Sequence, residues 1–195
     1  MSKGKFIAIE GIDKSGKTTL ANLLSLKLTG AGVENLVTRE PWHPLITRVI
    51  HETTSEGVDG YAEALLFAAD RLLHLKRLIS PVLAKGKWVI TDRYVYSSIA
   101  YQTARGAEED WVMEINKHAI TPDLTILLDI DPSEAEARSG DDRLMALENR
   151  IFSERIRRIY LELARKYGFL VLDALKKPES LVKQVFSELK RRGWV

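Results

Sequence analysis

Short apolar runs alternate with longer amphipathic stretches along this chain. Most of the runs are rich in Ile, Leu, Val and Phe, which is typical of strands that are buried on both faces. The predicted strands are residues 6–10, 33–38, 88–91, 124–129 and 169–172. The amphipathic stretches repeat their apolar positions every three to four residues, as helices do. The predicted helices are residues 17–29, 61–79, 94–105, 108–118, 149–167 and 178–191.

The alternation of strands and helices predicts the fold class. Parallel strands need a crossover connection, which is usually a helix, so this order favours an α/β fold. We predict a five-stranded parallel sheet flanked by helices on both faces, in a single domain that covers residues 1–195. A further helix is expected after Asp131, a good N-cap that is followed by Pro132. The segment with Pro41 and Pro44 is predicted to be a loop.

The turn after the first predicted strand carries a complete phosphate-binding motif. Residues 11–18 read GIDKSGKT, which matches G-x-x-x-x-G-K-[ST] between a strand and a helix. In such a loop the backbone N–H groups bind phosphate oxygens, Lys17 adds a positive charge, and Thr18 suits Mg²⁺. Asp13 and Lys14 are less usual there. Asp13 would need another task beside phosphates, such as a hydrogen bond to a substrate hydroxyl; the alternative is that both side chains point to solvent.

Two arginines predict a second anion site beside this loop. Arg39 follows the second strand and Arg93 follows the third, and ligands of parallel sheets bind at the carboxyl ends of the strands. One arginine there is often only a surface ion pair, whereas two beside a phosphate loop suit a second phosphate group. Asp92 is a candidate for holding Mg²⁺ or its water shell.

The helix predicted at residues 61–79 indicates what else the site could bind. At about 100° per residue, Phe67 and Arg71 share a side that lies away from the apolar stripe. An aromatic ring beside an arginine suits a flat polar heterocycle; the alternative is that Phe67 packs against a neighbouring helix. The stripe that we expect to face the core consists of Ala62, Leu65, Leu66, Ala69, Leu72 and Leu73.

Composition narrows the classes of function. The net charge is only +2, which does not favour a polyanionic partner such as nucleic acid. Because the chain has no cysteine, disulfides and thiolate metal sites are excluded, and the four histidines lack metal-ligand spacing. The apolar runs are too short for a signal peptide or a membrane span. We expect a cytoplasmic protein without a membrane or nucleic-acid partner.

These features together resemble the thymidylate kinase family of phosphate-loop nucleoside monophosphate kinases. The segment DRYVYSSIAYQ is the most specific of those that match. In the family's order, the matching segments are FIAIEGIDKSGKTTL at 6–20, TREP at 38–41, LLFAADR at 65–71, DRYVYSSIAYQ at 92–102, PDLTILLDIDP at 122–132 and ARSGDDR at 137–143. The resemblance implies phosphoryl transfer from ATP to dTMP with Mg²⁺, and a homodimer.

The resemblance also implies contacts for individual residues. Those to dTMP would come from Asp13, Arg39, Phe67, Arg71, Arg93, Ser98, Tyr101 and Gln102. Those to ATP would come from Gly11, Ile12, Asp13, Lys14, Ser15, Gly16, Lys17, Thr18, Arg138 and Arg143. Mg²⁺ would be held by Thr18 and Asp92, directly or through water. The residues expected to take part in catalysis are Lys17, Arg93, Asp13, Lys14 and Arg39.

Within these sets, the resemblance assigns particular tasks. Phe67 would stack on thymine, Arg71 would hydrogen-bond its carbonyl edge, and Tyr101 would lie under the sugar and disfavour a 2′-hydroxyl. Arg138 and Arg143 would belong to a short mobile lid around residues 138–147. No general base is expected, because a phosphate monoester is largely dianionic at pH 7 and is already a nucleophile.

Two segments depart from the family's pattern. WHPL follows TREP where the family often has glycines, which leaves the shape of the acceptor-phosphate loop open. The lid segment DDRLMALE lacks the usual aromatic or acidic residues after its arginine. Lys14 is therefore expected to supply more of the positive charge at the transferred phosphate than the lid does.

Other functions compete with this interpretation. A nucleotide-switch GTPase would need N-K-x-D, but residues 116–119 read NKHA and lack the acid that reads guanine. A phosphate-loop ATPase module would consume ATP without a nucleotide acceptor. Within the kinases, the main competitor is an enzyme that acts on another nucleoside monophosphate or on a deoxynucleoside.

Overall fold

Five strands form one parallel sheet in the part of the chain that the structure describes. This structure is a computed structural model that describes residues 4–55, 57–138 and 143–195, with the side chains of all of these except 55 and 143–149. The strand order is β2-β3-β1-β4-β5, and every pairing is parallel. The strands are β1 Phe6–Glu10, β2 Asn35–Arg39, β3 Trp88–Asp92, β4 Leu124–Asp129 and β5 Leu170–Asp173. The predicted α/β fold with five parallel strands is confirmed.

The strand order brings three segments of the predicted site to one edge of the sheet. β1 pairs with β3, where Ile9 is opposite Asp92, and β3 pairs with β2, where Arg39 is also opposite Asp92. The carboxyl ends of these three strands therefore lie side by side. Every residue of β1 and β3 is buried, which fits their nearly continuous apolar sequences.

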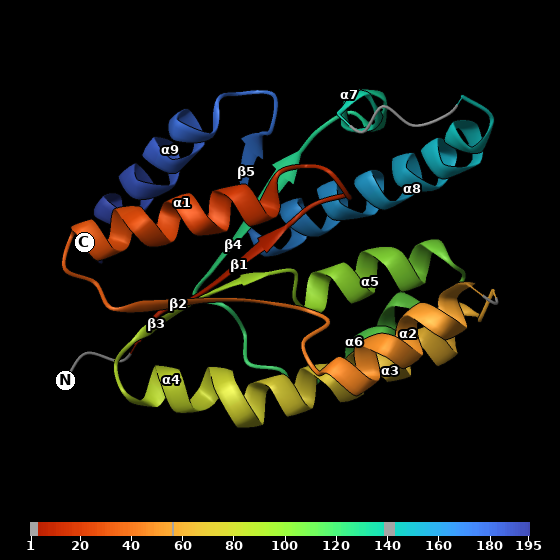
Figure 1. Cartoon of the computed structure of the whole chain (residues 1–195), viewed down its shortest axis with the longest axis horizontal. Helices are drawn as coiled ribbons and strands as arrows, with labels where there is room; N and C mark the ends of the chain where they lie inside the picture. Colours follow the sequence, from red (N-terminus) through yellow and green to blue (C-terminus); the bar gives the residue numbers. More distant parts are fainter. Residues whose placement is uncertain (1–3, 56, 139–142) are drawn as a thin grey trace.

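Helices cover both faces of the sheet (Figure 1). α1 and α9 lie against each other on one face, and α5 contacts both α3 and α8 on the other. The described helices before β3 are α1 Lys17–Gly30, α2 Pro44–Ser55, α3 Gly60–His74, the π-helical turn η1 Leu75–Ile79 and α4 Ser80–Ala84. Those after β3 are α5 Val95–Ala104, α6 Glu109–Ile115, α7 Pro132–Ala137, α8 Arg143–Tyr167 and α9 Pro178–Arg191. No described helix is long and apolar enough to cross a membrane.

The segment predicted to be a loop after β2 contains helix α2. Pro44 is its first residue, a position where proline is favoured because the N–H that it lacks would have no partner within the helix. The backbone N–H groups of Trp42 and His43, just before the helix, each donate to Asp70 of α3 at 2.7 Å. A partner that is distant in sequence thus fixes the start of α2, which sequence periodicity could not show.

The face of α3 that is buried differs from the prediction. Leu65 and Leu72 of the predicted core stripe are 53% and 44% exposed, and Ala69 is exposed as well. The residues that α3 buries are Gly60, Glu63, Ala64, Ala68, Asp70, Arg71 and His74. The polar members of this set have hydrogen-bond or ion-pair partners, so their burial is compensated. Leu65, Ala69 and Leu72 of the predicted stripe lie at the surface of the single chain, and its other three members are half-buried.

Candidate active site

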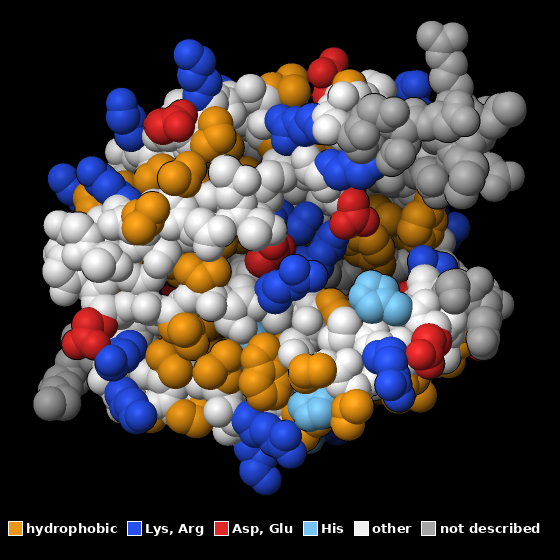
Figure 2. Space-filling model, in the orientation of Figure 1, with side chains coloured by type: hydrophobic (Ala, Val, Ile, Leu, Met, Phe, Trp, Pro, Cys, Tyr) orange, Lys and Arg blue, Asp and Glu red, His pale blue; other side chains and the backbone are white. Residues whose placement is uncertain are grey.

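The phosphate loop lies between β1 and α1 and lines a cavity of about 480 Å³. Two of its glycines are required by geometry. Gly11 has φ 147° and a Cβ there would lie 2.7 Å from the carbonyl oxygen of Leu128, while Gly16 has φ 97°. The cavity is lined by Asp13, Lys14, Gly16, Lys17, Thr18, Thr19, Arg39, Glu40, Asp92, Arg93 and Arg138. In Figure 2, basic and acidic side chains gather around a hollow near the centre of the molecule.

Lys17 is the buried cation of this cavity. Lys17 is the first residue of α1 and is only 6% exposed. Its Nζ donates to the carbonyl oxygen of Ile12 at 2.7 Å. Burial lowers the pKa of Lys17 to about 7, and the nearby charge of Arg93 adds to this effect, while neighbouring carboxylates oppose it. In the free protein the amine therefore loses its proton much more readily than the amine of an exposed lysine does.

A hydroxyl and a carboxylate meet on the wall of the same cavity. Thr18 Oγ1 donates to Asp92 Oδ2 at 2.5 Å, which joins the start of α1 to the end of β3. The described residues contain no group of three or more His, Cys, Asp or Glu side chains that could hold a metal ion. Mg²⁺ does not require such a group, because it keeps several waters and usually binds one or two carboxylates together with substrate phosphates. Thr18 and Asp92 therefore fit a Mg²⁺ site of this kind.

Arg93 lies where the phosphate-loop cavity meets a second cavity. It has φ 71°, and its guanidinium forms an ion pair with Asp13 at 2.5 Å. Nη2 also donates to the Tyr101 hydroxyl at 3.1 Å, and the guanidinium carbon lies 4.8 Å from the centre of the Tyr101 ring. Both cavities include Asp13, Glu40 and Arg93 in their linings. Arg93 can therefore contact ligands in both.

Asp13 is held at this junction by two partners. The Tyr101 hydroxyl donates to Asp13 Oδ2 at 3.0 Å, in addition to the ion pair with Arg93. Burial alone would raise the pKa of Asp13, but the charges of Arg93 and Lys17 outweigh it and leave the pKa below its usual value. Asp13 is therefore a carboxylate at neutral pH, suited to accept a hydrogen bond.

The second cavity has a volume of about 270 Å³ and lies between α2, α3 and α5. It is lined by Asp13, Glu40, Pro41, Ile50, His51, Thr54, Glu63, Phe67, Arg71, Arg93, Tyr94, Ser97, Ser98, Tyr101 and Gln102. All predicted acceptor contacts except Arg39 are in this set. Arg39 instead lines the phosphate-loop cavity. The structure thus places Phe67 at a cavity, as stacking on a ligand requires.

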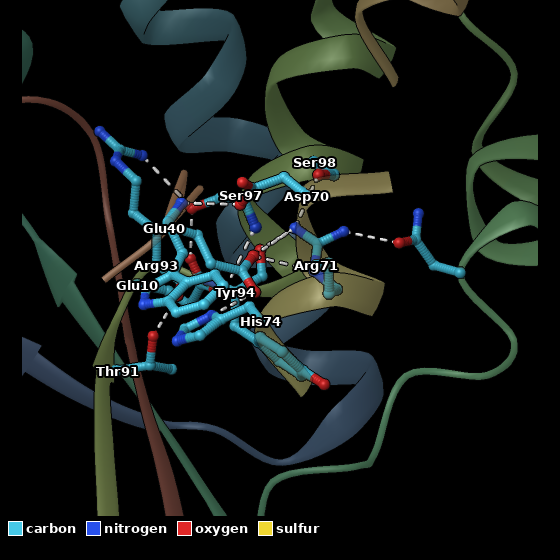
Figure 3. A network of polar contacts seen from close by, with 12 residues as sticks. Glu10, Glu40, Asp70, Arg71, His74, Thr91, Arg93, Tyr94, Ser97 and Ser98 are labelled. Atoms are coloured by element: carbon cyan, nitrogen blue, oxygen red, sulfur yellow. Dashed lines mark hydrogen bonds and ion pairs between the residues drawn. The ribbon is translucent and has the colours of Figure 1, made fainter. Parts of the chain in front are cut away.

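Arg71 is fixed by four partners that come from different parts of the chain (Figure 3). Nε donates to Glu40 at 2.9 Å and Nη1 donates to Asn116 Oδ1 at 2.6 Å. Nη2 donates to the Tyr94 carbonyl at 3.2 Å and to Ser98 Oγ at 3.0 Å. The side chain is 1% exposed, so its guanidinium has one orientation relative to the cavity.

Glu40, which the sequence did not single out, connects Arg71 to β2. It accepts from Arg71 and lies 3.3 Å from Nδ1 of His74, whose Nε2 is 2.8 Å from Thr38 Oγ1. The Trp42 ring stacks on His74, with centroids 5.2 Å apart and an angle of 10° between the planes. The only signal in the sequence was the acid itself within TREP.

Glu10, at the end of β1, positions the start of α5. Its carboxylate accepts from the backbone N–H groups of Tyr94 and Ser97, at 3.1 and 3.3 Å, and from the hydroxyls of Ser97 and Tyr160. A carboxylate at a helix N-terminus is favourable. Burial raises the pKa of Glu10, although these hydrogen bonds and the nearby arginines oppose the shift. Glu10 ends β1 just before the phosphate-loop motif, and nothing in the sequence marks it as a residue that organises the site.

Arg138 connects the phosphate loop to the segment after β5. Nη1 donates to the Lys14 carbonyl at 3.0 Å and Nη2 donates to the Ala174 carbonyl at 2.7 Å. Arg138 and Lys14 both line the phosphate-loop cavity. Residues 139–142 of the predicted lid lie outside the described residues. Of residues 143–147, which include Arg143, only the backbone is described.

Comparisons with known proteins show the family to which the chain belongs. The family model described as thymidylate kinase matches residues 9–185. A protein named "Probable thymidylate kinase" from Pyrobaculum aerophilum is 45% identical over 95% of this chain and 96% of its own length. Proteins with the same name from Staphylothermus marinus and Pyrococcus abyssi are 41% and 40% identical, over 94% and 96% of this chain and 94% and 97% of their own lengths. The chain belongs to the thymidylate kinase family.

Proposed function

We propose that the protein transfers the γ-phosphate of ATP to dTMP, giving dTDP and ADP. The observation that carries this proposal is the pair of adjoining cavities that share Asp13, Glu40 and Arg93. One cavity has a phosphate loop and the other has an aromatic ring beside a fixed arginine. Two nucleotides bound in this way would bring their phosphates together at Arg93.

Positioning and electrostatics supply the rate in this proposal. The dTMP phosphate is largely dianionic at pH 7 and attacks the γ-phosphate without a general base. The main obstacle is repulsion between two anions, which Lys17, Arg93, Arg39 and Lys14 reduce. Asp13, with its lowered pKa, accepts a hydrogen bond from the sugar and is a poor proton acceptor.

Magnesium fits the site through Thr18 and Asp92. Their oxygens are 2.5 Å apart beside the phosphate loop, where a hydroxyl and a carboxylate can bind the ion directly or through water. The ion would neutralise charge on the β- and γ-phosphates of ATP. Lys17 would bind the same phosphates from the first turn of α1.

The base of dTMP occupies the second cavity in this proposal. Phe67 stacks on the ring, Arg71 and Ser98 contact a carbonyl of the base, and Gln102 lies one helical turn after Ser98. Tyr101, held by Arg93 and Asp13, lies under the sugar and disfavours a 2′-hydroxyl. Arg138 and Arg143 belong to the lid over ATP.

The exposed stripe of α3 supports a homodimer. Leu65 and Leu72 lie on this stripe, and Leu45 and Val49 of the neighbouring α2 are also 63% and 39% exposed. A large apolar surface on a single chain is typical of a protein interface. A second copy of this chain would bury the stripe, and the dimer would act in the cytoplasm, where ATP and dTMP are available.

An acceptor panel tests the substrate. ADP release is measured with ATP and, separately, dTMP, dUMP, dCMP, dGMP, dAMP and thymidine. We expect dTMP to give the highest kcat/KM and no release without an acceptor. A higher kcat/KM for another monophosphate or for thymidine would assign the site to a different kinase, and release that is independent of the acceptor would indicate an ATPase.

A further inference from the structure

A fully buried histidine at the end of α3 lies behind the site and is not among the residues that line either cavity. The side chain of His74 is 0% exposed and lies beside Glu40 in Figure 3. Its Nδ1 is 3.3 Å from Glu40 Oε1, its Nε2 is 2.8 Å from Thr38 Oγ1, and the Trp42 ring stacks on its face. His74 therefore contacts three residues of one short segment, residues 38–42.

The chemistry of these partners fixes where the ring carries its proton. A carboxylate only accepts hydrogen bonds, so Nδ1 must be protonated and donate to Glu40. In the neutral ring Nε2 is then the acceptor, and the Thr38 hydroxyl donates to it. Turning the ring over would place carbon atoms against both partners. The imidazole thus joins the side chains of Thr38 and Glu40 in a single orientation.

Arg39 lies between the two residues that the imidazole joins. Thr38 and Arg39 end β2, and the Glu40 N–H extends the pairing by donating to the Asp92 carbonyl at 3.0 Å. Successive side chains of an extended strand point to opposite sides. Because Thr38 and Glu40 both reach His74, the side chain of Arg39 points the other way, and it lines the phosphate-loop cavity.

The Arg39 side chain has no support of its own. It is exposed, and it has no hydrogen-bond or ion-pair partner in the part of the chain that the structure describes. Its direction is therefore set by the backbone of residues 38–42. α3 holds this segment at two places, because Asp70, one turn before His74, accepts from the N–H groups of Trp42 and His43.

We propose that His74 is a positioning residue for the acceptor phosphate, which orients Arg39 toward the phosphate-loop cavity by holding Thr38 and Glu40. The inference rests on the proposed function, in which Arg39 binds the phosphate of dTMP. His74 itself touches no substrate. A misplacement of about 1 Å, caused by a change away from the reacting atoms, can cost about a hundredfold in rate.

A double-mutant cycle with Arg39→Ala tests this inference. His74→Phe keeps a ring that can stack on Trp42 but removes both hydrogen bonds, and Thr38→Val removes only the hydroxyl that donates to Nε2. With dTMP as acceptor, we expect His74→Phe to lower kcat/KM by about tenfold or more and Thr38→Val by about fivefold or more. In the Arg39→Ala background each change should lower kcat/KM by less than about twofold, because the side chain that His74 orients is gone.

His118→Phe is the matched control, since it makes the same replacement at an exposed histidine and should keep the kcat/KM of the wild type. Thermal melting shows whether each variant is folded. If His74→Phe is not, Thr38→Val, which replaces one hydroxyl by a methyl group, carries the same test.

Equal losses in both backgrounds would overturn the inference, because a loss of stability alone does not depend on Arg39. A normal kcat/KM in the folded single variants would overturn it as well. If the wild type does not phosphorylate dTMP at all, the proposed function fails instead, so the two failures are distinguishable.

Discussion

Lys17 must be charged to bind phosphate, yet its position removes it from water. The same burial that brings Nζ to the phosphate loop lowers its pKa to about 7, well below the usual value for lysine. Phosphate oxygens would reverse this shift, because a nearby negative charge favours the protonated amine. At the residue scale, we therefore expect nucleotide binding to be coupled to proton uptake.

Proton uptake by Lys17 can be measured. Above pH 7 the free protein holds Lys17 mostly neutral, whereas the nucleotide complex holds it charged, so binding at pH 8.5 should take up close to one proton. Affinity for ATP should fall as the pH rises above about 7. Titration calorimetry at pH 8.5 in two buffers of different ionisation enthalpy gives the proton count. Lys17→Met should abolish the uptake, and equal heats in both buffers for the wild type would contradict the assignment.

Arg93 is expected to contribute a large part of the rate. Its guanidinium contacts Asp13 and Tyr101 at the junction of the two cavities, where charge on the transferred group must be neutralised. Arg93→Ala should lower kcat by at least about a hundredfold, the effect of losing one preorganised donor, and Lys17→Ala should do the same. Steady-state assays check this. The control is Arg150→Ala, which breaks an exposed ion pair on α8 and should keep a kcat near that of the wild type. A normal kcat in Arg93→Ala would show that Arg93 does not contribute to the rate in this way.

At the scale of elements, α3 shows where periodicity gives the wrong face. Its apolar positions form a clear stripe, but Asp70, Arg71 and His74 face inward because each has a partner distant in sequence. A pattern of apolar residues cannot show which buried surface is a binding site. It also cannot tell a core contact from an interface between chains. The phosphate loop was predictable because spacing, strand and helix all agree within twenty residues.

The residues that were missed share a physical reason. Glu10 and Glu40 lie in segments that resemble the family, but no spacing assigns either of them or Asn116 a role; all three hold other site residues in place. Their importance depends on contacts across the sheet and between helices. The predicted acceptor residues, in contrast, follow strand ends, share one side of a helix or lie in segments that resemble the thymidylate kinase family, so the sequence offered a signal for each prediction.

Asp70 should stabilise the start of α2. It is fully buried, and it accepts from the N–H groups of Trp42 and His43. Asp70→Ala leaves both donors unpaired and should lower the free energy of unfolding by about 1–3 kcal/mol. KM for dTMP should rise as well, because α2 lines the acceptor cavity. Denaturant unfolding measures the loss. Glu52→Ala, on the exposed side of α2, should change the free energy by less than about 0.5 kcal/mol; an equal loss would contradict this account.

At the scale of the whole molecule, the exposed stripe of α3 predicts the assembly. Leu65→Glu and Leu72→Glu together would place two charges in the proposed interface and should convert the dimer to a monomer. Analytical ultracentrifugation at micromolar concentration gives the mass. Leu26→Glu, on α1 and 69% exposed, is the matched control and should remain a dimer. A monomeric wild type would show that the stripe is not covered by a second copy.

The central claim is that the two cavities pass a phosphoryl group directly between two nucleotides. The most direct test follows ATP labelled in its γ-phosphate in the presence of dTMP and Mg²⁺. We predict that the label appears in dTDP, with one dTDP formed for each ADP. Label that appears instead as free phosphate, at a rate that does not depend on dTMP, would contradict the account.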